Sequence, residues 1–155
     1  MTENIQSNAD GLELKKIAVW KIILLVTVTY GVYIPIWFLK QREALNGLNS
    51  DVKIGFRIIV FIIVLYALSL VLLFNSLISI MLPQSIFSYL STSLHLETIE
   101  NLIGIVAGIL VLIQSFRVRR ILFQNLYGSG KDVRFSGICT FFLTIYYLQY
   151  KINRL

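Results

Sequence analysis

Hydrophobic residues gather along the chain in four uninterrupted runs, separated by shorter polar stretches. The runs cover residues 22–39, 58–82, 101–116 and 135–150, and none of them contains a charged residue or histidine. Their apolar residues are continuous rather than spaced to form one helix face, which is typical of helices in lipid. The pattern therefore predicts an all-α, polytopic helical membrane protein, with a flexible polar tail at 1–11 and a single membrane domain at 12–155.

The two central runs give the strongest prediction. The 25 residues of 58–82 would form a helix of about 37 Å, enough to cross a hydrocarbon core of about 30 Å with some tilt. The run 101–116 would reach about 24 Å, so it crosses only if Glu100 lies at one interface and Arg117 extends its side chain to the headgroups at the other. Between them lies the Ser-rich stretch 83–100, where we expect a short helix on the membrane surface.

The two outer runs are predicted to be broken segments, re-entrant segments or short spans. Run 22–39 contains Gly31 and Pro35, and proline lacks the amide hydrogen that the Gly31 carbonyl would accept in a straight helix. We therefore expect a kink or a full turn at Gly31 and Pro35. Run 135–150 reaches only about 24 Å as a helix, so spanning is borderline.

Composition and charge add an orientation. The chain is 57% hydrophobic with a formal net charge of +6, and the 59 positions from Ile58 to Phe116 hold no Lys or Arg. Because cytoplasmic loops are enriched in Lys and Arg, we place loops 40–57 and 117–134 in the cytoplasm and 83–100 outside a prokaryotic cell membrane. The basic residues border apolar runs instead of forming a basic domain, so no nucleic-acid partner is expected.

The charges also discriminate between two topologies. If all four runs cross, five of the 14 Lys and Arg residues lie outside, in the two tails. If the outer runs enter and return on the cytoplasmic side, all 14 lie inside, as the charge rule favours. A re-entrant backbone needs surrounding protein, which two spans supply poorly unless several copies assemble. On balance we favour the re-entrant topology.

Three sets of residues are candidates for helix packing and lipid contact. Gly104 and Gly108 have the GxxxG spacing that lets helices approach closely, within the chain or between copies. Asn75 and Asn101 fall at similar heights, where they either share a hydrogen bond or are hydrated. Five basic residues, each worth about 1 kcal/mol near anionic headgroups, are expected to contact the cytoplasmic leaflet: Arg117, Arg119, Arg120, Lys131 and Arg134.

Two stretches resemble a family of small prokaryotic membrane proteins that is classed as a domain of unknown function. The first stretch carries Gly31, Tyr33, Trp37, Phe38, Lys40, Leu45 and Asn46. The second, at the end of the chain, carries Tyr147, Leu148, Gln149, Tyr150, Lys151, Asn153, Arg154 and Leu155. The resemblance implies a membrane domain, and it implies no activity because none is established for the family.

The remaining chemistry points away from an enzyme or a pump. Proton relays keep ionisable groups inside the membrane, and no apolar run holds one. His95, Glu97 and Glu100 do not have the spacing of a metal site or a catalytic pair, and the single Cys139 has no partner for an intrachain disulfide. We predict a non-enzymatic protein without cofactors that self-associates or serves as a partner subunit. The alternative is a pore or carrier subunit for a small solute or ion. Its path would be lined by the backbone freed at Pro35 and by the side chains of Thr27, Thr29, Tyr30 and Tyr33.

Overall fold

The computed structural model describes residues 14–81, 96–128 and 135–155, and these parts contain helices and no strand. The helices are α1 (Val19–Val28), α2 (Tyr33–Gly47), α3 (Phe56–Met81), α5 (Leu96–Gly128) and α6 (Gly137–Asn153). The predicted all-α class is thereby confirmed. The predicted tail at 1–11, most of the surface helix expected in 83–100, and the basic residues Lys131 and Arg134 lie outside the described residues.

α3 and α5 are the two long helices. At 26 and 33 residues they measure about 39 and 50 Å, with mean hydropathies of 2.9 over Phe56–Asn75 and 1.9 over Thr98–Tyr127. Within the described residues these two helices are long and apolar enough to cross a membrane, by length and composition. Helix α5 is longer at both ends than the predicted run 101–116, because its helical backbone continues without a break through Arg117 and Arg120.

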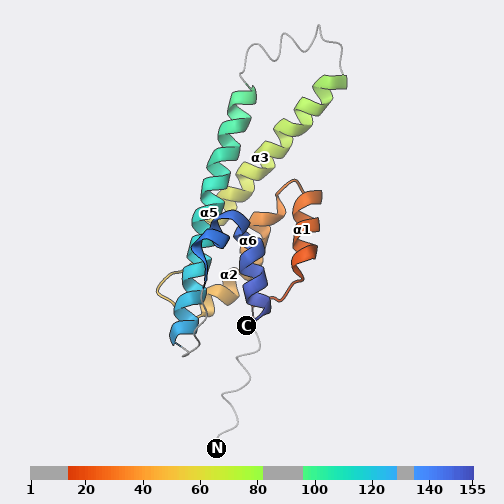
Figure 1. Ribbon diagram of the computed structural model, residues 1–155. Coiled ribbons are helices and arrows are strands. Elements are labelled where there is room, and N and C mark those ends of the chain that lie inside the picture. Colours follow the sequence, from red (N-terminus) through yellow and green to blue (C-terminus); the bar gives the residue numbers. More distant parts are fainter. Residues whose placement is uncertain (1–13, 82–95, 129–134) are drawn as a thin grey trace, which may run out of the picture.

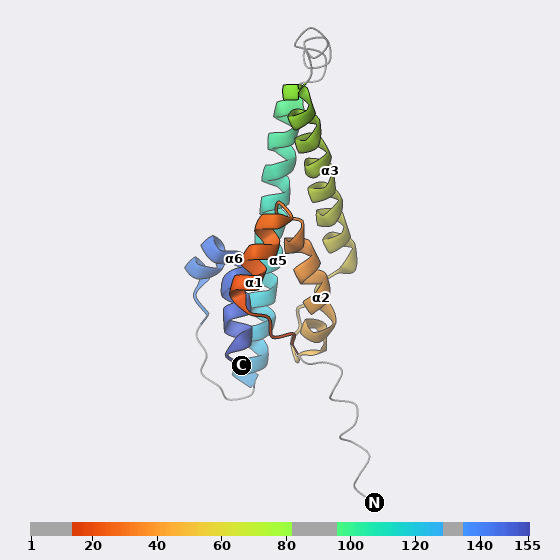
Figure 2. The ribbon, with the colours of Figure 1, turned by 90° about the vertical axis from the view of Figure 1, so that its right-hand side faces the viewer.

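Run 22–39 folds into two short helices instead of one. Tyr30 has φ 48° and Gly31 has φ 88°, so the backbone turns sharply between α1 and α2. The two helices then run in opposite directions, and the far end of α2 returns to the end of the molecule from which α1 started (Figures 1 and 2). A non-glycine residue with positive φ is uncommon, and glycine adopts such angles without steric cost.

Pro35 lies in the first turn of α2 and not at the break itself, where we expected it. It is the third residue of α2, where its missing amide hydrogen removes no intrahelical bond. The Gly31 carbonyl accepts a hydrogen bond from the Ile34 amide at 2.9 Å, and the Thr29 hydroxyl accepts one from the Tyr33 amide at 3.0 Å. The break therefore lies at Tyr30 and Gly31, and Pro35 helps to start the following helix.

Helix α6 is also interrupted. Thr144 has φ 38° and ψ −115°, which are not helical angles. The chain reverses there, and the second part of α6 returns toward the end of the molecule that holds Leu155 (Figures 1 and 2). Both outer runs thus have the form of a helical hairpin, and the two hairpins flank the lower halves of α3 and α5.

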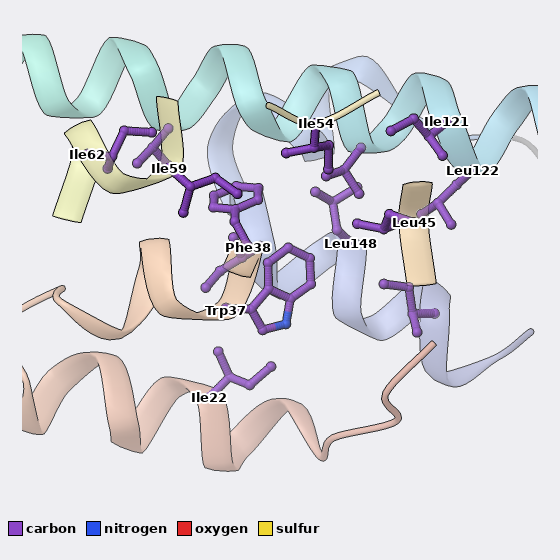
Figure 3. Packing of buried hydrophobic residues seen from close by; sticks show 14 of the residues in the cluster. Ile22, Trp37, Phe38, Leu45, Ile54, Ile59, Ile62, Ile121, Leu122 and Leu148 are labelled. Carbon is purple, nitrogen blue, oxygen red and sulfur yellow. The ribbon is translucent and has the colours of Figure 1, made fainter. Parts of the chain in front are cut away.

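The buried core lies where the hairpins meet α3 and α5. Trp37 and Phe38 of α2 lie between Ile22 of α1 and Ile59 of α3, and all four side chains are completely buried (Figure 3). Beyond the hairpins, α3 and α5 diverge toward Met81 and Leu96 (Figure 1). Among the described residues, the core therefore occupies one half of the molecule, and the other half is formed by the remaining parts of α3 and α5.

Candidate functional site

A network of buried amide side chains joins α2 to α6. The Trp37 Nε1–H donates to Gln149 Oε1 at 2.7 Å, and Gln41 Nε2 donates to the same oxygen at 3.3 Å. Gln41 and Gln149 are completely buried, although they are 108 residues apart. Buried polar groups need partners because they have lost their hydrogen bonds to water. Each of these residues meets that need through residues of a distant helix.

The same network fixes the extended segment that precedes α1. Gln41 accepts from the Lys15 amide at 3.0 Å and donates to the Lys15 carbonyl at 2.8 Å. Asn153 accepts from the Ile17 amide at 3.2 Å and donates to the Ile17 carbonyl at 2.7 Å. In extended chain, the backbone groups of residues two apart face the same side. The two side-chain amides therefore replace the neighbouring strand that this segment lacks.

Asn46 holds a second extended segment in the same manner. Its Oδ1 accepts from the Ile54 amide at 2.7 Å, and its Nδ2 donates to the Ile54 carbonyl at 3.1 Å. Arg42 Nε donates to that carbonyl at 3.2 Å. Ile54 is buried and lies directly before α3. The connection from α2 into α3 is thus rigidly placed without secondary structure of its own.

The turn between α1 and α2 lies against Tyr66 of α3. A Cβ on Gly31 would lie 2.7 Å from Cε1 of Tyr66, so only glycine fits between that ring and the turn. Tyr66 and Tyr146, which follows the break at Thr144, are both partly buried against the same hydrophobic core.

The hydroxyl groups proposed to line a pore have partners inside their own helix. Thr27 donates to the Ile23 carbonyl at 2.9 Å, and Thr29 donates to the Leu25 carbonyl at 2.7 Å. Tyr33 is buried in the core, whereas Tyr30 is exposed. These four side chains therefore differ in exposure, with Thr27 and Tyr30 exposed, Thr29 half-buried and Tyr33 buried.

The predicted helix-packing residues are not used by the described helices. Apart from the neighbouring residues and backbone of α5 itself, no described atom lies within 4 Å of a Cβ built on Gly104 or Gly108. Asn75 and Asn101 are both exposed, and no hydrogen bond joins them. This face of α5 is open along the described part of the chain.

The three arginines of the predicted lipid contact have different roles. Arg119 donates to the Phe135 carbonyl through Nε at 3.2 Å and Nη2 at 2.9 Å, so it attaches the start of α6 to α5. Arg117 and Arg120 instead line a groove beside Lys53. Their partners in the prediction, Lys131 and Arg134, are beyond the described ranges.

Gln114 is a buried residue that the sequence analysis did not single out. Both of its amide atoms are buried and have no hydrogen-bond partner among the described residues. A glutamine inside an apolar run is itself a signal, since such a side chain is costly without a partner. The same signal applies to Gln149, which does have partners.

Across 14–81, 96–128 and 135–155 no three His, Cys, Asp or Glu residues lie close enough to hold a metal ion. His95 lies outside these ranges, and Cys139 is half-buried without a disulfide partner.

Comparison of the chain with models of known protein families, with curated protein sequences and with solved protein structures finds no significant match. The resemblance to a domain of unknown function therefore stays a prediction. The description of the candidate site rests on the geometry alone.

Proposed function

We propose that this chain is a small, non-enzymatic, multi-pass protein of a prokaryotic cell membrane that self-associates or serves as a partner subunit. In this proposal α3 and α5 cross the bilayer, while the α1–α2 hairpin and α6 enter from the cytoplasmic face and return to it. No catalytic group, cofactor or nucleic acid takes part.

One observation carries the membrane proposal. In the half of the molecule beyond the hairpins, large apolar side chains are exposed around both long helices: Val71 is 62% exposed, Phe74 56%, Leu102 61% and Ile105 60%. A soluble monomer rarely exposes so large a contiguous apolar surface. Lipid tails are the simplest solvent for it.

The positive charges support the orientation. Lys15 lies just before α1, Arg57 at the start of α3 and Lys151 near the end of α6, while Arg117 directly follows the apolar run of α5. If the outer runs re-enter, the basic residues of both tails and of both loops lie on one side, which agrees with the enrichment of Lys and Arg in cytoplasmic loops. The stretch 83–100 is then the part exposed outside.

The turn between α1 and α2 supports the re-entrant proposal through its hydrogen bonds. Irregular backbone at membrane depth is tolerated only where protein shelters it and satisfies its polar groups. The Gly31 amide donates to the Val26 carbonyl at 2.8 Å, and the Val32 amide donates to the Thr29 carbonyl at 3.1 Å. The turn is further covered by Tyr66.

Cysteine labelling tests the topology. In a Cys139→Ser background, Lys16→Cys, Asn49→Cys and Leu155→Cys should react with a membrane-impermeant maleimide only from the cytoplasmic side. Thr98→Cys should react only from outside. All four positions are exposed. Labelling of position 16 or 155 from outside intact cells would show that the outer runs cross.

A pore or carrier subunit remains the alternative, with less support. The Thr27 and Thr29 hydroxyls are already hydrogen-bonded within α1 or its end, and Tyr33 is buried. Solute flux into liposomes that contain the purified protein, and its loss in Gly31→Leu, would favour this alternative over the first proposal.

A further inference from the structure

A groove of about 750 Å³ lies between α5, the first part of α6 and the segment that precedes α3. One end is basic and the remainder is apolar. Lys53, Arg117 and Arg120 supply the basic end, and Ile109, Ile113 and Phe141 are among the apolar lining residues. We propose that this groove binds one membrane phospholipid with a net negative headgroup, its phosphate at the three cations and an acyl chain along the apolar wall.

The basic end is assembled from two separate parts of the chain. Arg117 and Arg120 are three residues apart on α5, which places them on one helix face. Lys53 comes from the segment fixed by Asn46, and its Nζ donates to the carbonyls of Asn46 at 2.8 Å and Leu48 at 3.1 Å. Those two bonds orient the ammonium group and leave one of its three hydrogens for a ligand.

The two arginines have no competing anion within the described parts of the chain. Neither Arg117 nor Arg120 forms an ion pair or a side-chain hydrogen bond there, in contrast to Arg119, which is bonded to Phe135. A guanidinium group binds phosphate through paired N–H donors. Three cations at one end of a groove therefore favour a phosphate, and they disfavour a headgroup that carries its own ammonium.

The apolar wall determines which kind of phosphate compound fits. Starting beside the cations, Phe116, Ile113 and Ile109 follow one another at helical spacing on α5, toward the N-terminal end of this helix. They span about 10 Å along the helix axis. Ile109, Ile113 and Phe141 are about half exposed, so an acyl chain would cover apolar surface that begins beside the cations. A free phosphate ion would leave this wall uncovered.

The inference rests on the proposed membrane location, because the wall would then face the cytoplasmic leaflet. In the membrane, Arg117 would lie at the end of the apolar part of α5, at headgroup level. Basic pockets of this kind, between membrane helices on the cytoplasmic side, bind anionic headgroups.

Native mass spectrometry of the detergent-purified full chain tests the site, with dioleoyl phosphatidylglycerol as the probe and dioleoyl phosphatidylcholine as the neutral comparison. Each cation near a lipid surface contributes a factor of about five in affinity. We therefore expect phosphatidylglycerol to bind about 100-fold more weakly to the triple variant Lys53→Gln/Arg117→Gln/Arg120→Gln. Lys16→Gln/Lys40→Gln/Arg154→Gln removes equal charge from exposed positions outside the groove and should bind as the unchanged chain does. Equal weakening in both triple variants would overturn the site.

Two further variants test the acyl-chain contact by itself and control for misfolding of the triple variant. Ile113→Trp should fill the wall and weaken phosphatidylglycerol several-fold without changing the cations. If Ile113→Trp has no effect and inorganic phosphate displaces the lipid, the site holds only an ion and the inference is wrong. The charge-conserving Lys53→Arg/Arg117→Lys/Arg120→Lys should retain the preference for phosphatidylglycerol, and its loss there would contradict the proposal.

The same preparation separates this inference from the membrane proposal. If the groove shows no preference for the anionic lipid while cysteine labelling finds α3 and α5 inserted, only the lipid site fails. If the labelled positions are reached equally from both sides, the membrane proposal itself fails.

Discussion

Two glutamines in apolar runs have opposite environments. Gln149 makes four hydrogen bonds, to Trp37, Gln41, the Lys15 carbonyl and Asn153, whereas both amide atoms of Gln114 lack a partner in the part of the chain that the structure describes. A buried amide without partners has lost its hydrogen bonds to water without replacing them. The same residue type should therefore respond in opposite directions to the same substitution.

We expect Gln114→Met to raise the free energy of unfolding by about 1–3 kcal/mol, because it removes an unpaired buried amide with little change in shape. Gln149→Met should lower it by about 2–4 kcal/mol, because the Trp37 Nε1–H and the Lys15 carbonyl lose a partner. Denaturant unfolding of the detergent-solubilised protein measures both. A loss of stability in Gln114→Met would show that this amide has a partner after all.

At the level of elements, the two hairpins are the feature that gives the molecule its shape. The α1–α2 turn depends on Gly31 for two separate reasons, a φ of 88° and the close approach of Tyr66. Glycine adopts this angle freely, while an L residue is strained by roughly 1 kcal/mol or more. The contact adds to this, since a Cβ would lie 2.7 Å from the Tyr66 ring.

Gly31→Ala should consequently lower the free energy of unfolding by about 2 kcal/mol or more. A Tyr66→Leu background should recover the part that arises from the ring contact and leave the part that arises from φ. Gly55→Ala is the matched control, because Gly55 has no positive φ and its Cβ would meet only Cδ1 of Ile58, at 4.0 Å. Thermal unfolding of the unchanged chain, the two variants at position 31, Tyr66→Leu and the control measures these differences, and equal effects at positions 31 and 55 would contradict the explanation.

The two hairpin breaks differ in whether the local sequence predicts them. Gly31 is a recognisable signal, since glycine in an apolar run marks a place where the helix is easily interrupted. Thr144 has no such signal, and its φ of 38° is imposed on an ordinary residue. The reversal there allows the second part of α6 to bring Gln149 and Asn153 onto the segment before α1. The packed structure around Thr144 must offset the local strain.

At the scale of the whole molecule, the open Gly104 and Gly108 face of α5 bears on self-association. In lipid, helices associate through close packing at small residues, and the described helices leave this face uncovered. The proposed self-association predicts that the detergent-solubilised protein exceeds the mass of one 17.8 kDa chain.

Gly104→Leu should reduce that mass toward a single chain, because the added side chain prevents the backbones from approaching. Light scattering coupled to size exclusion measures it, with Val71→Leu as a control that enlarges an equally exposed apolar position on α3. A native protein that is already monomeric would leave only the partner-subunit form of the proposal.

The amino-acid sequence by itself determined the helical class, the two long apolar helices and the break at Gly31. These are local properties: runs of apolar residues, their length, and the backbone freedom of glycine act within a few residues. The basic residues at 117 and 120 could likewise be recognised as lipid-facing candidates, because their position beside an apolar run is visible in the chain.

Only the tertiary structure decided which side chains meet. The pairing of Gln149 with Trp37, the reversal at Thr144 and the place of Lys53 beside Arg117 depend on segments brought together from distant parts of the chain. Hydrogen-bond partners of buried amides are chosen by packing, and similar amides such as Gln114 and Gln149 cannot be distinguished by their neighbours in sequence. For the same reason Arg119 supports the fold, while Arg117 and Arg120 remain available for a ligand.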